Sequence, residues 1–460
     1  VMTLSMSSLL MKLPPSFRVL PVMFGAVLIH LSLGTYHTFG NMLPYMASYM
    51  RNYTDSSITE EEMVWIPTLQ GCFPFAMVLG GLLAHKLGPR IAAGLGCLTM
   101  VSGVYLSSFT ISISLLSFVF TYGFMYGLGQ GIAYVVAVSS VINWAPDRVG
   151  LVSGVVAAGF GLSSSIFAPI QTALVNPSNY PPQRDGYFIE KDLLEKVPVV
   201  FRMLASVYAL MQMIGLLFIC DPPSEATRIR RRSQSRDSSE VGEEERDGDR
   251  DSIIPDLAPL KSSLTPPEML RSPTFYALFT ALFCCSFYAN TFYNLYKTFA
   301  LTFIEDDMFL AMAFSVGSIA NAAARIAWGH FTDRTSFQMT LSVACCVACA
   351  LLLSMPLTSL AGKWVFLAWL TLLFTCMAAT HALFITAVVK CFGARYKATN
   401  YGLLILSTTL SGVALSLLSQ YALGSLGYSW MFLITAIFPF TAFVITANID
   451  RTPHGHFISG

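Results

Sequence analysis

The sequence predicts an all-α polytopic membrane protein with twelve transmembrane helices. Of its 460 residues, 54% are hydrophobic and 12% are charged, and this charged share is about half of what soluble proteins carry. The mean hydropathy of +0.61 leaves too few polar side chains to cover a water-facing surface. A soluble enzyme, a disordered chain and a fibrous protein are therefore excluded, and the formal net charge of +1 excludes a nucleic-acid binder.

Each transmembrane helix needs about 20 apolar residues to cross the hydrocarbon core of a bilayer. Twelve stretches of the chain meet this requirement, and their apolar runs are continuous rather than alternating. We expect helices near residues 20–49, 63–84, 91–111, 115–143, 149–173, 200–220, 274–300, 309–331, 337–358, 363–389, 399–424 and 427–448.

One long hydrophilic stretch, residues 221–272, divides these helices six and six. Its mixed charges and few aromatic residues are typical of a flexible linker, and Arg231-Arg232-Ser233 within it is either a kinase site or part of a solvated run. Since the chain begins at Val1 rather than Met, we expect sequence to precede it. The predicted organisation is an N-terminal six-helix bundle (1–220), a cytoplasmic linker (221–272), a C-terminal six-helix bundle (273–450) and a cytoplasmic tail (451–460).

The short loops carry their charges unevenly. Basic side chains on one side are Lys86, Arg90, Arg148, Arg334, Lys390, Arg395 and Lys397, and acidic side chains on the other are Glu60, Glu61, Glu62, Glu305, Asp306 and Asp307. The positive-inside rule places the basic loops, both termini and the linker in the cytoplasm. We expect the plasma membrane rather than an organelle, and the sequon Asn52-Tyr53-Thr54 on the opposite side predicts a glycoprotein.

A glycine-containing turn recurs at matching places in the two halves. It reads G-L-L-A-H-K-L-G-P-R at residues 81–90, after the second helix, and G-H-F-T-D-R at residues 329–334, after the eighth. Such a turn uses glycine for a tight reversal between adjoining helices and a basic residue at the cytoplasmic face. The two copies together indicate an internal repeat.

In layout and motifs the chain resembles the major facilitator superfamily, and across residues 121–170 it is similar to the monocarboxylate transporter and oxalate–formate antiporter branch. In the first half the motifs that carry this resemblance are Gly127-Leu-Gly129-Gln-Gly131-Ile-Ala-Tyr134, Trp144-Ala-Pro146-Asp147-Arg148-Val-Gly150, Ser153-Gly154 and Gly159-Phe-Gly161. In the second half they are Asn321-Ala-Ala-Ala-Arg325-Ile-Ala-Trp328-Gly329 and Phe392-Gly393-Ala-Arg395, leading to Asn400-Tyr401-Gly402. The resemblance implies a major facilitator fold in two six-helix halves and an alternating-access transporter of small organic anions. It also implies a cytoplasmic charge lock, with His85 where the family usually has aspartate, formed by Gly81, His85, Gly88, Arg90, Asp333 and Arg334.

Arg325 is the leading candidate for substrate binding. It lies inside the eighth helix, about one and a half to two turns before the cytoplasmic end, where a bare guanidinium costs roughly 2.5 kcal/mol or more. Its planar fork suits a carboxylate, and no Asp or Glu lies inside the apolar cores to neutralise it. The resemblance implies the same role, because the family has an arginine on this helix that binds the substrate carboxylate. The alternative is that Arg325 caps backbone carbonyls or snorkels to water.

Two positions depart from the proton-coupled members of that branch. Those members have an acidic residue four positions before the arginine, where this chain has Asn321, and a lysine on the first helix, where the alignment gives Asn41. Neither asparagine can titrate, so a proton relay of that kind is in doubt. The candidate replacements are His30 and His37 on the first helix, although each could be a satisfied polar residue in a helix contact.

Five more residues are candidates for contact with the substrate. A tyrosine offers an apolar ring with one hydroxyl, which suits a small substrate with a polar head. Each of these residues could instead belong to helix packing or to the interfacial belt. The five are Tyr36, Tyr134, Asn290, Asn294 and His381.

Three functions remain open at this point. The first is a carrier of monocarboxylates or similar organic anions, and the second is a facilitative carrier of neutral or aromatic amino acids that is not proton-coupled. The third is a non-transporting receptor on a transporter fold. An enzyme is not expected, and neither are a cofactor, a metal site or a disulfide, because the ten cysteines lie in or beside apolar segments. The expected partners are a small carboxylate or amino acid and the lipid bilayer, with the protein as a monomer.

Overall fold

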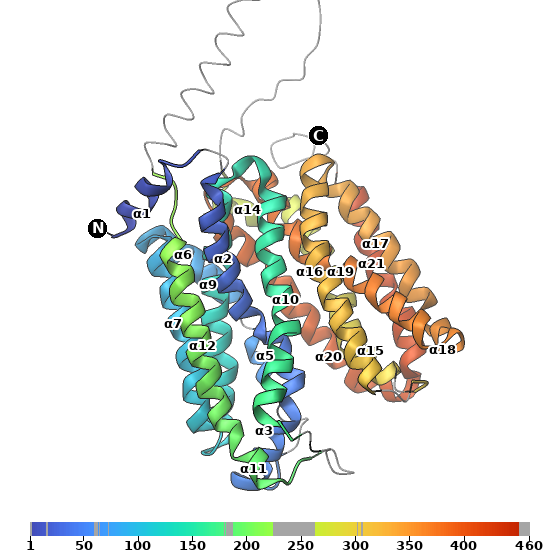
Figure 1. The fold of residues 1–460 in the computed structure, drawn as a ribbon. Helices are drawn as coiled ribbons and strands as arrows, with labels where there is room; N and C mark the ends of the chain where they lie inside the picture. The colour runs from blue at the N-terminus through green and yellow to red at the C-terminus, as the bar shows by residue number, and fades with distance from the viewer. Residues whose placement is uncertain are drawn as a thin grey trace, which may run out of the picture.

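The computed structural model describes residues 2–14, 17–58, 63, 65–71, 73–178, 180, 187–223, 263–300, 302–304 and 307–449. Over these residues the chain is built of helices without strands (Figure 1). Ten helical stretches within them are long and apolar enough to cross a membrane, and the helices α6 and α16 complete the predicted set. The all-α twelve-helix membrane fold is therefore confirmed.

The first half of the chain forms the elements on the blue-to-green side of Figure 1. They are α1 (Met2–Leu10), α2 (Val19–Leu33), η2 (Gly34–Thr38), α3 (Phe39–Tyr53), α5 (Trp65–Gln70), α6 (Phe73–Leu87), α7 (Pro89–Thr110), α8 (Leu115–Phe118), η3 (Val119–Met125), α9 (Tyr126–Trp144), η4 (Pro146–Arg148), α10 (Val149–Val175), α11 (Lys191–Leu194) and α12 (Lys196–Phe218).

The second half forms the yellow-to-red elements. They are α14 (Pro266–Leu270), α15 (Pro273–Ala300), α16 (Asp307–Arg334), α17 (Phe337–Ser354), η5 (Met355–Leu357), α18 (Thr358–Ala361), α19 (Lys363–Phe392), α20 (Lys397–Thr435) and α21 (Ile437–Ala447). Within α20 the backbone leaves the helical region at Gly427, where φ is 75°. Glycine tolerates this left-handed value, and the break separates the eleventh and twelfth helices where the sequence predicts it.

The first transmembrane helix is interrupted near its middle. Residues 34–38 form the 3-10 stretch η2, where the sequence analysis expects an unbroken helix over 20–49. Gly34 lies against the carbonyl oxygen of Phe160 on α10, so closely that a Cβ would collide. The hydroxyls of Thr35 and Thr38 donate to carbonyl oxygens three residues earlier, at 2.9 and 2.7 Å, and such bonds compete with regular helix pairing.

Both ends of the predicted linker are placed, while residues 224–262 lie outside the described part of the chain. At its start, Asp221 Oδ1 accepts a hydrogen bond from Asn143 at the end of α9, at 2.9 Å. Near its end, the Leu264 amide donates to the carbonyl of Phe392 at 2.9 Å. The helix α14 follows, with a capping box between Thr265 and Glu268. Helical structure thus begins before residue 272, where the linker is expected to end.

The first six and last six helices meet mainly along two pairs, α10 with α16 and α6 with α20. Backbone touches backbone at glycines in both pairs. Gly150 of α10 lies against Gly329 of α16, and a Cβ at Gly81 of α6 would lie 2.7 Å from the Thr399 amide nitrogen of α20. Small residues allow this close approach. We call the end of the bundle where α6 and α16 finish and α10 and α20 begin the linker end; Figure 1 places α14 there, at the top.

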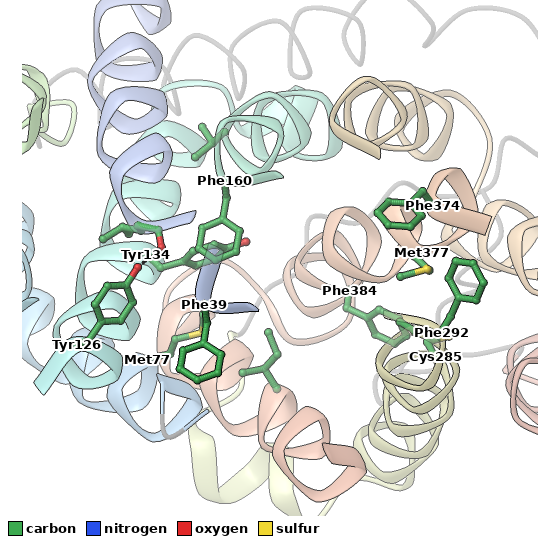
Figure 2. Packing of buried hydrophobic residues seen from close by; sticks show 14 of the residues in the cluster. Phe39, Met77, Tyr126, Tyr134, Phe160, Cys285, Phe292, Phe374, Met377 and Phe384 are labelled. Atoms are coloured by element: carbon green, nitrogen blue, oxygen red, sulfur yellow. Dashed lines mark hydrogen bonds between the residues drawn. The ribbon is translucent and has the colours of Figure 1, made fainter. Parts of the chain in front are cut away.

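Aromatic side chains fill much of the interior of each half. Figure 2 shows Tyr134 of α9 beside Phe160 of α10 in the first half, with ring centroids 5.4 Å apart. In the second half, Phe292 of α15 lies near Phe374 of α19, with centroids 6.1 Å apart. The first ring pair lies in the first half and the second pair in the second half; the candidate site lies where α10 of the one meets α16 of the other.

Candidate functional site

Arg325 lies in α16 at its contact with α10, and its side chain is 1% exposed. Nε donates to Oδ1 of Asn321 and Nη1 donates to the carbonyl oxygen of Ala157, both at 2.9 Å. A guanidinium has five N–H donors, so one on Nη1 and both on Nη2 have no hydrogen-bond partner among the described residues. Both acceptors are uncharged, and no described carboxylate contacts the guanidinium. The arginine is therefore held in place without being neutralised.

Asn321 holds the guanidinium in position through its side-chain amide. Its Oδ1 accepts from Arg325, and its Nδ2 donates to the carbonyl oxygen of Phe374 on α19 at 2.7 Å. Both ends of the amide are thus engaged, and the side chain is buried. The asparagine ties α16 to α19 and fixes the orientation of Arg325.

Two glycines of α10 make room for α16 at this level. A Cβ at Gly161 would lie 3.2 Å from both Cζ and Nε of Arg325, and a Cβ at Gly154 would lie 2.5 Å from the Arg325 carbonyl oxygen. The sequence analysis places both glycines in the stretch that resembles the transporter branch. Their place in the structure shows that Gly161 also bounds the space around the guanidinium.

Three tyrosines from three other helices lie near the same charge. Tyr134 of α9, Tyr293 of α15 and Tyr401 of α20 are close enough for the charge of Arg325 to act on their hydroxyls. Tyr134 and Tyr401 are buried. The site therefore draws on both halves of the chain, as a transporter site between two bundles requires.

His37 joins the two halves through its ring. It stacks on Tyr293 with centroids 5.9 Å apart and planes 10° apart, and it meets the edge of Phe160 at 5.3 Å. Tyr36, the preceding residue of η2, packs against the same imidazole at 5.2 Å. His37 and Tyr36 thus lie in the aromatic wall next to the arginine site, where substrate-contacting residues are expected.

The candidate asparagines on the first and seventh helices lie elsewhere. Asn41 donates to the Ala168 carbonyl and the Thr172 hydroxyl of α10, both at 3.2 Å. Asn290 donates weakly to the Ser411 hydroxyl of α20 at 3.4 Å. These contacts hold helices together, and none of them reaches Arg325. The side chains of Asn294 and His381 lie outside the described part of the structure.

Asp333 closes the linker end between the halves. Its Oδ1 and Oδ2 accept hydrogen bonds from the backbone amides of Gly150 and Leu151, at 3.0 and 2.8 Å. These amides begin α10, where the helix dipole favours a negative charge. The aspartate thus caps a helix of the opposite half, and it does so through backbone amides rather than through the basic side chain that a charge lock predicts.

His85 occupies the matching place on α6 and makes a different contact. Its Nε2 lies 3.1 Å from the carbonyl oxygen of Arg395 in the turn before α20, so Nε2–H is the donor. The imidazole also packs against the ring of Tyr396, with centroids 5.4 Å apart. A single imidazole donor to a carbonyl thus replaces the two-amide helix cap that Asp333 provides in the other copy.

The remaining lock candidates act within their own half or at the surface. Gly88 has φ of 84° and ends the turn before α7, which a glycine adopts without strain. Arg90 donates to the carbonyls of Ile219 and Leu217 at the end of α12, at 3.0 and 2.7 Å. Arg334 is exposed at the end of α16. Arg90 therefore caps a helix of the first half and does not bridge the halves.

Sequence reasoning does not name as substrate contacts three groups that lie near Arg325. They are the rings of Tyr293 and Tyr401 and the carbonyl oxygen of Ala157. Tyr401 follows the Phe392-Gly393-Ala-Arg395 motif and Tyr293 lies about one turn after Asn290, so proximity to marked residues is an available signal. A backbone carbonyl such as that of Ala157 leaves no trace in the sequence.

Comparison with known proteins places this geometry in context. Residues 22–415 match the model of the Major Facilitator Superfamily. The apicoplast pyruvate carrier 1 of Toxoplasma gondii is 26% identical over 94% of this chain and 89% of its own length. The oxalate:formate antiporter of Oxalobacter formigenes is 25% identical over 80% of this chain and 78% of its own length. The transporter FucP, solved in an outward conformation, superimposes with a TM-score of 0.66 at 14% identity, over 94% of this chain and 99% of FucP.

Proposed function

The chain belongs to the Major Facilitator Superfamily, and from this premise we propose that it carries small monocarboxylates across a membrane by alternating access. It is an integral multi-pass transporter and not an enzyme. The relatives named for pyruvate, oxalate and formate support organic anions as the substrate class. In this proposal the substrate carboxylate binds the Nη1–Nη2 edge of Arg325.

One observation carries the assignment. Arg325 is buried, and its two hydrogen bonds go to uncharged oxygens. A buried unpaired charge is costly, so such residues in membrane helices usually serve a ligand or ion pathway. Nε is occupied by Asn321, which leaves the end-on edge of the guanidinium for bidentate contact with a carboxylate.

Alternating access is supported by the contacts between the halves. The linker end is held by Asp333 and by glycine contacts in both helix pairs. FucP, to which the fold is similar, was solved in an outward conformation. We assign this structure to the state closed on the cytoplasmic side. The termini and the linker are cytoplasmic in this proposal, the plasma membrane is the expected location, and the apicoplast relative keeps an organelle membrane as the alternative.

Uptake into proteoliposomes tests the role of Arg325. Labelled pyruvate, L-lactate and oxalate are offered to the unaltered protein and to Arg325→Ala, Arg325→Lys and Arg271→Ala. Loss of a charged hydrogen bond costs about 1.5–3 kcal/mol, so Arg325→Ala should reduce uptake by roughly tenfold or more. Arg325→Lys keeps the positive charge but loses the planar guanidinium, so its uptake should lie between that of the unaltered protein and that of Arg325→Ala. Arg271, exposed after α14, is the control and should transport normally.

Three outcomes decide among the open functions. Unchanged uptake by Arg325→Ala would remove the arginine from the substrate site. Competition by phenylalanine, tyrosine or leucine, with no effect of the short acids, would favour an amino-acid carrier. Binding of an acid without flux into sealed vesicles would favour a receptor.

A further inference from the structure

A buried lysine lies where the two halves meet at the linker end. Lys397 is the first residue of α20, and its side chain is 5% exposed. Its Nζ donates to Oδ1 of Asn143, near the end of α9, so this bond joins the second half to the first. The other acceptor is the carbonyl oxygen of Ala394, at 3.5 Å. Both acceptors are uncharged.

The charge of this lysine is only partly compensated. An ammonium group has three N–H donors, and the described residues provide no carboxylate in direct contact with it. The acidic member of the network is Asp221, whose Oδ1 accepts from Nδ2 of Asn143 at 2.9 Å. The amide of Asn143 therefore stands between the two charges. A cation that is buried without a contacting anion destabilises the state that buries it.

The place of Lys397 in its helix adds to this cost. The helices α10 and α20 are the fifth transmembrane helices of their halves, and both begin at the linker end. The start of α10 receives the carboxylate of Asp333 on two backbone amides, which the helix dipole favours. The start of α20 carries a cation, which the same dipole disfavours. The two matching helix starts thus have opposite charges beside them, and the one at α20 is unfavourable.

The two partners of the lysine belong together to the first half. Asn143 lies in α9, and the carbonyl oxygen of Cys220, directly before Asp221, accepts from Nε1 of Trp144 at 2.7 Å. Lys397 belongs to the second half. When the halves separate at the linker end, the amide and the carboxylate therefore leave the ammonium together, and water takes their place.

We propose that Lys397 lowers the stability of the state closed at the linker end and so promotes its opening, because separation of the halves returns the buried charge to water. Asn143 and Asp221 offset part of the cost of burial, so they restrain opening. The inference rests on the proposed function in one respect, since it takes the linker end to open and close. The balance between the lysine and its two partners then sets the share of molecules open at this end.

Two members of one network should therefore shift this equilibrium in opposite directions. Asp221→Asn keeps an oxygen for Asn143 but removes the charge, so the ratio of open to closed molecules should rise roughly fivefold. Lys397→Met replaces the cation by an apolar side chain of similar length, so the ratio should fall by a similar factor, and Lys397→Leu repeats this test. A network that only held the halves together would give a rise in every variant.

Distance measurements on the full-length protein in lipid nanodiscs test this expectation. Spin labels on the exposed Lys86 and Thr335, one in each half, are followed by pulsed dipolar spectroscopy. Lys397→Met is also combined with Asp333→Asn, which weakens another contact of the linker end, so that a fall in the open share can be measured. Gln338→Ala is the control, because Gln338 donates to a backbone carbonyl of its own half at 2.9 Å.

The amine of Lys397 also reports its own exposure to water. A water-soluble N-hydroxysuccinimide ester acylates lysines that solvent reaches, and mass spectrometry measures the labelled share at this position. Labelling of Lys397 should rise in Asp221→Asn in step with the open share. A lysine that stays unlabelled while the spin labels report opening would overturn the return of its charge to water.

The remaining results separate this inference from the proposed function. If opening is seen but the open share of Lys397→Met and Lys397→Leu does not fall, the role of the lysine is overturned and the proposed function stands. If Asp221→Asn does not raise the open share, the restraint by its carboxylate is overturned in the same way. A single distance in every variant, with and without pyruvate, would instead reject alternating access itself.

Discussion

At the scale of single residues, the neutral partners of Arg325 distinguish this site. Oδ1 of Asn321 accepts a hydrogen bond from Nε of Arg325, and Nδ2 of Asn321 donates one to a carbonyl oxygen of α19. A carboxylate at the same position would supply a permanent counter-ion. The choice of asparagine therefore leaves the charge of the arginine for a ligand.

Replacing Asn321 by aspartate should make transport depend on pH. In the Asn321→Asp variant the ionised carboxylate would pair with Arg325 and compete with the substrate, so uptake near neutral pH should fall about tenfold, or ~1.4 kcal/mol. As pH falls and the new carboxylate protonates, the guanidinium is released and uptake should recover. Uptake profiles between acidic and neutral pH measure this, with the neutral Asn321→Ser as control. Parallel profiles for both variants would contradict the expected competition.

Substrate binding should also be sensitive to a larger side chain at Gly161, next to the guanidinium. In Gly161→Ala the new Cβ would lie 3.2 Å from Cζ and Nε of Arg325, so the fork must shift and substrate affinity should fall several-fold. The helix itself gains about 0.5–1 kcal/mol from the change, so thermal stability should not fall in step. Gly40→Ala, which meets open space, is the matched control. Measurements of substrate affinity and of the unfolding temperature on the same variants distinguish an effect on the site from a loss of stability.

The candidate site was predictable where side chains carry the chemistry. Arg325, Tyr134 and His37 stand out in the sequence because charged and polar groups are rare in apolar helices. The contacts of Asn41 were not predictable, since its partners are a backbone carbonyl and a hydroxyl of α10 that the sequence does not mark.

At the scale of elements, the two copies of the glycine turn hold the halves with different strength. Asp333 accepts two bonds from backbone amides at the start of α10, whereas His85 donates one bond to a carbonyl before α20. The two copies were predictable from the sequence as a repeat. Their partners are backbone atoms, which the sequence could not indicate.

Removing the charge from Asp333 should loosen the linker end. A helix cap of this kind contributes about 1 kcal/mol, so Asp333→Asn should raise the share of molecules open at this end by roughly fivefold. Spin labels on the exposed Lys86 and Thr335, one in each half, report the separation by pulsed dipolar spectroscopy. Asp55→Asn removes a similar exposed contact at the other end, to Ser57, and should leave the label distance unchanged. An unaltered distance distribution in Asp333→Asn would rule out the cap as a latch.

At the scale of the whole molecule, a buried lysine ties the start of the linker to both halves. Lys397, at the beginning of α20, is 5% exposed, and its Nζ donates to Asn143 Oδ1 of α9. The Asn143 amide in turn donates to Asp221, whose charge acts on the lysine. One network thus links α9, α20 and the segment that follows α12.

Removing Asp221 alone should lower the stability of the fold more than removing Asp221 and Lys397 together. Asp221→Ala leaves Lys397 buried without its counter-charge, so unfolding should become easier by about 1–3 kcal/mol. The double variant Asp221→Ala with Lys397→Met replaces the pair by apolar groups and should recover part of the loss. Thermal unfolding of both variants measures the difference, with Asp192→Ala at the far end as control. Additive losses in the double variant would show that the two charges act independently.

The unequal fastening of the two helix pairs has a consequence for how the molecule opens. The α10–α16 side is held by the Asp333 carboxylate at the start of α10 and by the backbone contact between Gly150 and Gly329. The α6–α20 side also has a glycine backbone contact, between Gly81 and Thr399, but there the imidazole of His85 takes the place of the anion. We therefore expect the α6–α20 contact to separate before the α10–α16 contact when the linker end opens. Arg325 lies on the α10–α16 side, so a substrate anion would stay bound to it while the two halves separate on the other side.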